Sequence, residues 1–315
     1  MDPSVFAAVL FAAACHAGWN AAIKGGMDTV STTSLIAIGA GVVALVLLPF
    51  VGLPLVQAWP WVIASVVIHL LYFIGLSESY RVGDLGQVYP IARGTAPLMT
   101  AALSAPLIGE ALGALAWIGI VALAAGVLLL SARGGGAREH FPEKWKPVFR
   151  RKCDQRKKSE RVSDPVKSKR ALGRFDAHAT GLALFTATTI CAYSLVDGVG
   201  ARLAGGAHAY TASLFVGNAV ALAGYGLARR RREAIPALAA YWRIGLAGGA
   251  LQLVAYGIVI WAMTVAPIAI VAALRETSVL FGALIAVVIL KEPLRASRVA
   301  AALLIVAGLV MIRLH

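Results

Sequence analysis

Charged residues and cysteines are scarce in this chain, and their scarcity excludes several classes of protein. Only 14% of the 315 residues are charged, whereas 59% are hydrophobic, which is far from the composition of a soluble globular domain. The three cysteines, Cys15, Cys153 and Cys191, are too few and too scattered for a disulfide framework or a metal cluster. The sequence contains no HExxH motif. We therefore expect neither a metal nor a cofactor.

The net charge of +14 is concentrated in one stretch. Residues 133–176 hold fifteen Lys or Arg and six Asp or Glu, so +9 lies there and only +5 in the rest of the chain. A basic surface for a nucleic acid is therefore not expected. The stretch is dense in charge and lacks an apolar period, so we expect a mostly disordered linker, with docking to anionic membrane lipid as the alternative.

Hydrophobic runs long enough to cross a bilayer recur along the rest of the chain. A membrane-spanning helix needs roughly 20 apolar residues. Ten such segments are expected, near Val5–Ile23, Thr33–Leu53, Trp59–Ser77, Leu85–Ile108, Gly113–Ser131, Ala177–Gly200, Ala209–Ala228, Trp242–Thr264, Pro267–Leu290 and Ser297–Leu314. The sequence thus predicts an all-α multi-pass membrane protein with little room for a soluble catalytic domain.

The two halves of the chain repeat each other. Arg93 and Glu110 recur as Arg275 and Glu292, both shifted by 182 residues. Four further pairs share this register: Thr95 and Thr277, Ala101 and Ala283, Leu112 and Leu294, Gly126 and Gly308. We expect two five-helix repeats, 1–132 and 177–315, joined by the linker 133–176. An odd number of helices in each repeat inverts the second relative to the first.

Lys and Arg in the connections predict the orientation. Odd-numbered connections are basic even without the linker, whereas only Arg202 and Arg313 lie on the other side. The positive-inside rule then places both termini outside the cytoplasm. A bacterial inner membrane is the expected location.

The fourth predicted helix carries an arginine between two prolines. Pro90 and Pro97 each free a backbone carbonyl, so we expect this helix to be broken. Arg93 lies about 12 Å along it at 1.5 Å per residue, near the middle of the bilayer, with Tyr89 on the same face. A charge at that depth needs a partner or a water-filled cavity, so Arg93 is a candidate for a functional site. The alternative is a structural role, in which Arg93 holds helices together through ion pairs.

Further polar residues could converge on the same place. The ninth helix carries Arg275 and Glu276; Glu276 is either a proton carrier or the partner of an arginine. His16 and Asn20 lie four residues apart on the first helix, and we expect His16 as a second candidate for proton coupling. In the second repeat, Tyr193 and Tyr256 are candidate substrate contacts.

Two glutamates at helix exits are expected to be structural. Glu110 and Glu292 mark the ends of helices 4 and 9, where they could satisfy backbone groups at tight connections. Gly245 and Gly249 form a GxxxG motif that indicates close helix packing.

Three runs resemble the EamA-type family of the drug/metabolite transporter superfamily. They are GWNAAIK at 18–24, GDLGQVYPIARG at 83–94, and the exit motifs GEAL at 109–112 and KEPL at 291–294. The resemblance implies ten helices in two repeats and a secondary transporter that moves small metabolites through a central cavity. The basic linker and the absence of basic residues between 52 and 58 depart from the family pattern.

The leading functional hypothesis is secondary transport of a small anionic or zwitterionic metabolite, bound by Arg93 and Arg275. Proton-coupled export of cationic drugs is the rival within transport. An integral membrane enzyme is a hypothesis of another class, disfavoured because His69 in the third helix has no acid near it in the sequence. A non-transporting scaffold is the last alternative. The solute, coupling ion and oligomeric state do not follow from the sequence.

Overall fold

A computed structural model describes residues 1–23, 29–82, 85–132, 177–230, 241–288 and 296–314. The first half contains the helices α1 (Pro3–Ile23), α2 (Thr29–Val51), α3 (Trp59–Val82), α4 (Leu85–Ile108) and α5 (Ala114–Ala132), with a short 3-10 helix, η1 (Val56–Ala58), before α3. The second half contains α7 (Ala177–Leu203), α8 (Ala207–Arg230), α10 (Trp242–Val265), α11 (Ile268–Arg275), α12 (Ser278–Val288) and α13 (Ala296–Leu314). The predicted linker lies outside the described residues.

These helices confirm the predicted all-α membrane fold. Ten helical spans occupy the ten predicted positions when α11 and α12 are counted as one, and six of the described spans, α11 with α12 among them, are long and apolar enough to cross a membrane. Their outward faces carry large apolar side chains, such as Phe50 and Val220, that a soluble protein would bury. The protein is therefore an integral, multi-pass membrane protein.

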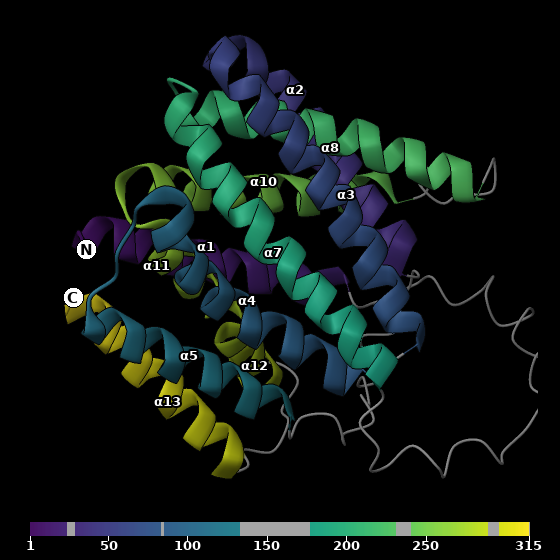
Figure 1. Ribbon diagram of the computed structural model, residues 1–315. Helices are drawn as coiled ribbons and strands as arrows, with labels where there is room; N and C mark the ends of the chain where they lie inside the picture. Colours follow the sequence, from purple (N-terminus) through teal and green to yellow (C-terminus); the bar gives the residue numbers. More distant parts are fainter. Residues whose placement is uncertain (24–28, 83–84, 133–176, 231–240, 289–295, 315) are drawn as a thin grey trace, which may run out of the picture.

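The packing of the helices follows the repeat. Two pairs of equivalent helices pack on each other, α5 on α13 and α2 on α8, and they lie at the lower left and the top of Figure 1. In the repeat, α1 is equivalent to α7 and α3 is equivalent to α10. The packing of α3 on α7 in the structure therefore has its counterpart in the packing of α10 on α1. The chain therefore forms two five-helix repeats related by an approximate two-fold axis, and the second is inverted.

Repeated glycines bring the pairs of helices together. A Cβ atom on Gly308 would lie 2.6 Å from the Gly119 carbonyl oxygen, and one on its repeat partner Gly126 would lie 3.0 Å from the Ala301 carbonyl oxygen. Elsewhere, a Cβ on Gly249 would lie 2.2 Å from the Ala40 backbone nitrogen, between α10 and α2. These glycines let helix backbones touch, as small residues do in membrane bundles.

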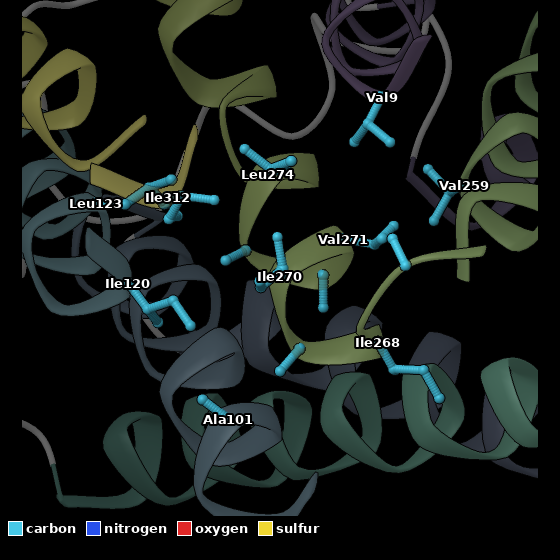
Figure 2. Close-up of a cluster of buried hydrophobic side chains, with 14 of the residues drawn as sticks. Val9, Ala101, Ile120, Leu123, Val259, Ile268, Ile270, Val271, Leu274 and Ile312 are labelled. Carbon is cyan, nitrogen blue, oxygen red and sulfur yellow. The ribbon is translucent and has the colours of Figure 1, made fainter. Parts of the chain in front are cut away.

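The centre of the bundle is α11. All eight of its residues are buried, among side chains from α1, α4, α5, α7 and α10. Figure 2 shows Ile268, Ile270, Val271 and Leu274 of α11 surrounded by apolar side chains of neighbouring helices. A segment held on every side in this way has little freedom, so whatever its C-terminal end carries is positioned rigidly.

Candidate functional site

The ninth span is interrupted in the middle of the bundle. Glu276 and Thr277 form a turn between α11 and α12. The backbone N–H groups of Glu276 and Thr277 donate to carbonyls three residues back, at 3.0 and 3.1 Å, and the Thr277 hydroxyl donates to the Leu274 carbonyl at 2.7 Å. A hydroxyl that competes for a helix carbonyl favours such a break. The sequence predicted the span, Pro267–Leu290, but did not locate this break.

The break expected in the fourth span is absent. α4 is helical without interruption from Leu85 to Ile108, through both Pro90 and Pro97. Each proline removes a single donor, and in a spanning segment the remaining hydrogen bonds hold the helix because no water competes for them. The two equivalent spans thus differ: the one with prolines is continuous, and the one without internal prolines is broken.

Three charged groups meet beside this break. Arg93 Nη1 donates to both oxygens of Glu276, at 3.0 and 3.3 Å, and Arg275 Nη2 donates to Glu276 Oε1 at 3.3 Å. The three residues are buried, with exposed fractions of 8% for Arg93, 4% for Arg275 and 0% for Glu276. The repeat therefore brings its two arginines together on one carboxylate. We call Arg93, Arg275 and Glu276 the charge cluster.

The charge cluster contains one more cation than anions. Arg93 Nη2 lies 3.2 Å from His16 Nε2. A guanidinium has no acceptor, so this histidine nitrogen accepts and the ring is neutral in this arrangement. Two guanidinium groups and one carboxylate therefore sum to +1. In addition, the buried Nε of Arg275 has no hydrogen-bond partner among the described residues. The cluster can take a further acceptor.

An aromatic group borders the charge cluster. The Arg275 guanidinium lies 5.4 Å from the centre of the Tyr193 ring, within the range of a cation–π contact. Tyr193 in turn stacks on His69, with ring centres 4.3 Å apart, and Tyr256 packs edge-on against His69 at 5.9 Å. Tyr72 also meets Tyr193 edge-on, at 5.8 Å. Rings from α3, α7 and α10 therefore form one side of the site.

A second carboxylate lies beyond these rings. Asp197 of α7 is fully buried; its oxygens accept from the hydroxyls of Tyr256 at 2.5 Å and Tyr210 at 3.0 Å. The sequence placed no acid near His69, but in the structure the Tyr256 ring contacts His69 while its hydroxyl reaches Asp197. The sequence placed Asp197 on one face of its helix with Tyr193, four residues earlier. It could not show that tyrosines of other helices bind Asp197, because the group comes from four helices.

The remaining predicted residues fall in three places. His16 contacts Arg93, and Tyr256 is one ring removed from Arg275. Pro97 lies within α4. The side chains of Asn20, Tyr89 and Pro90, and the whole of Glu292, lie outside the described part. Within that part no three His, Cys, Asp or Glu residues form a group that could hold a metal.

Glu110 joins the two repeats at one end of the bundle. Its carboxylate accepts from Arg202 Nη2 at 2.5 Å and from the backbone N–H of Ile268, the first residue of α11, at 2.8 Å. Arg202 also donates to the carbonyls of Met263 and Ala266. The sequence interpretation had Glu110 satisfying backbone groups at the connection that follows α4, but it caps a helix of the other repeat.

The residue before Glu110 ends α4. Gly109 has a φ of +73°, and its N–H donates to the Ala105 carbonyl.

The repeat and its buried centre agree with a comparison to known families. A model of the EamA-like transporter family matches residues 4–132 and 179–314. The chain belongs to this family. Its members are membrane transporters of the drug/metabolite transporter superfamily. The matched ranges exclude the whole of the predicted linker, residues 133–176.

A solved crystal structure shares the fold of this EamA-like protein. It aligns with a TM-score of 0.69 at 17% identity, covering 98% of this chain and 96% of the other. At that identity the likeness shows the fold alone. No curated protein matches the chain.

Proposed function

We propose that this EamA-like protein is a secondary active transporter of a small anionic or zwitterionic metabolite, and that the charge cluster binds the anionic group. The observation that carries the proposal is the buried Nε of Arg275, which has no hydrogen-bond partner among the described residues and belongs to a cluster whose formal charge is +1. An isolated buried charge is costly. An incoming carboxylate or phosphate would lower that cost and accept the free N–H.

In this proposal the Glu276 carboxylate occupies the anion-binding position when no solute is bound. Without solute, its carboxylate occupies both arginines; an anionic solute competes with it and takes over part of the hydrogen bonding. A guanidinium binds carboxylates and phosphates through two parallel hydrogen bonds, so Arg93 and Arg275 suit such groups. A zwitterion could in addition place its ammonium against Glu276. The charge cluster is thus suited to bind the solute reversibly.

Tyr193 and Tyr256 shape the pocket for the rest of the solute in this proposal. Tyr193 holds Arg275 through the face of its ring, so the ring restricts where the guanidinium can point. We assign the protein to a bacterial inner membrane and to transport rather than enzymatic chemistry. Export of cationic drugs remains the rival, and Asp197 favours it, because an acid among aromatic rings suits a cation.

The test is a thermal-stability screen of the purified protein with citrate, inorganic phosphate, glutamate and tetraphenylphosphonium. We expect anions or glutamate to raise the unfolding temperature, and Arg275→Ala to weaken that binding at least thirtyfold, since truncating one partner of a buried charge pair costs about 2–5 kcal/mol. Arg313→Ala is the matched control, because Arg313 lies at the end of α13 and donates to the Met1 carbonyl. Stabilisation by the cation alone would contradict the proposal and support the rival.

Liposome transport then separates a transporter from a scaffold. Citrate or glutamate flux by the wild type, lost in Arg275→Ala but retained in Arg313→Ala, would support transport through the charge cluster. Solute binding without flux would favour the scaffold.

A further inference from the structure

Asp197 and Glu276 are both fully buried carboxylates, but their partners differ. Glu276 is bound by two guanidinium groups. Asp197 has only the neutral hydroxyls of Tyr210 and Tyr256, and no ion pair reaches it among the described residues. Within one bundle, Glu276 therefore faces cations, whereas Asp197 faces neutral hydroxyl groups.

The difference decides what a proton would disrupt at each acid. A proton on Glu276 would leave two buried guanidinium groups without their carboxylate partner. A proton on Asp197 would leave no guanidinium without a partner, because its donors are two neutral hydroxyls. Intramembrane acids of this kind serve as proton-binding sites.

The groups that face Asp197 are themselves neutral or distant. Tyr210 comes from α8, Tyr256 from α10 and His69 from α3, while Tyr193 lies one turn earlier on α7. The Ser65 carbonyl can only accept, so His69 Nδ1, 2.9 Å away, carries its proton. Arg202, five residues later on α7, is bound to the Glu110 carboxylate, and Arg275 of α11 lies over the Tyr193 ring.

We propose that Asp197 is the proton-binding site of the transport cycle, separate from the anion-binding charge cluster and linked to it through Tyr256, His69 and Tyr193. The proton arrives from water on one side of the membrane, binds one carboxylate oxygen and leaves to the other side. This inference rests on the proposed transport function, of which it names the coupling ion.

The hydrogen bonds supply the link. An ionised Asp197 accepts from both tyrosines, but a protonated one must itself donate through one oxygen. One tyrosine hydroxyl must then turn from donor to acceptor or leave. If Tyr256 moves, its ring shifts against His69, on which Tyr193 stacks, and Tyr193 holds Arg275. Binding of a proton would thus alter the position of an arginine that binds the solute.

Infrared spectroscopy tests the site without any solute. The carbonyl band of a buried protonated carboxylic acid should appear and disappear as the pH of wild-type proteoliposomes is changed. Asp197→Asn should abolish that band, whereas Glu276→Gln should retain it. A titrating band that survives Asp197→Asn, or a wild type with no titrating buried acid, would overturn the proposal.

A second variant covers the case in which Asp197→Asn does not fold. Tyr256→Phe keeps the ring and removes one donor to the carboxylate, so the band should titrate at a pH higher by about one to two units. An unchanged midpoint would contradict the assignment. Tyr225→Phe, in α8, is the matched control, since Tyr225 is no partner of Asp197.

Coupling is tested with a proton gradient. Gradient-driven uptake of citrate or glutamate should be lost in Asp197→Asn, while exchange of the same labelled solute without a gradient persists. Loss of both would mean that Asp197 serves binding and not coupling. Failure of the anion proposal would be recognised separately, because the infrared band does not depend on any solute or on Arg275.

Discussion

Glu276→Gln tests the electrostatic reasoning most directly. The substitution keeps the shape of the side chain but removes its charge, so the formal charge of the buried cluster rises from +1 to +2. Glu276 accepts three hydrogen bonds from Arg93 and Arg275, at 3.0, 3.3 and 3.3 Å, and an amide presents one acceptor and two donors in their place. Breaking a buried ion pair costs about 3–5 kcal/mol, and we expect a loss of unfolding free energy in that range.

The lost stability should be recoverable by an anion. A ligand that binds only the folded protein stabilises it by about 2.7 kcal/mol at a hundred times its dissociation constant. An anion that takes the place of the Glu276 carboxylate would therefore offset half or more of the loss. The variant should also bind citrate or phosphate more tightly than the wild type, because the internal competitor is gone. Unfolding in detergent micelles, titrated with each anion, measures both effects.

Glu110→Gln is the matched control. It also removes a carboxylate that bonds an arginine, but the side chain of Arg202 is 33% exposed and keeps two carbonyl partners. We expect a smaller loss of stability and no additional response to anions. The reasoning is refuted if Glu276→Gln is as stable as the wild type, or if anions stabilise the two variants equally.

Two other predictions concern packing and pH. Gly308→Ala should lower the unfolding free energy of the bundle by about 1–3 kcal/mol, because the new methyl group would meet the backbone of α5. Gly282→Ala is the control, because its methyl group would enter open space, and it should be neutral or slightly stabilising in the same unfolding assay. The hydrogen bonds from the Ser4 hydroxyl and backbone lower the pKa of the exposed Asp2 carboxyl. Its stabilising effect on the start of α1 should be present above the unfolded-state pKa and be lost as the pH falls through the lowered value, and NMR titration of Asp2 would show an ordinary pKa if this were wrong.

Much of the fold follows from local signals in the sequence. Apolar runs of about 20 residues predicted the ten helical segments, and for α4 both ends agree with the structure. The pair Gly126 and Gly308 was visible as a repeat, but its role was not. A periodicity shows that two positions are equivalent; it does not show that both lie where α5 and α13 meet.

The centre of the site was less predictable, because it depends on which helices meet. Proline pointed to a break in α4, but the break lies at Glu276, where side chains compete with the backbone. The meeting of Arg93 and Arg275 on one carboxylate is a tertiary contact between residues about 180 positions apart. The tyrosine partners of Asp197 were hidden for the same reason, since they come from α8 and α10.

The repeat also explains why the buried charge is unbalanced. The 182-residue shift that matches Arg93 with Arg275 matches Glu276 with Gly94. A Cβ atom on Gly94 would lie 2.6 Å from Leu128 Cγ, so α4 and α5 are packed too closely there for an acid. A fully symmetric pair would hold two arginines and two carboxylates and would be neutral. Because close packing in the first repeat excludes the second acid, both arginines share Glu276, and the cluster keeps a formal charge of +1 that suits an anionic ligand.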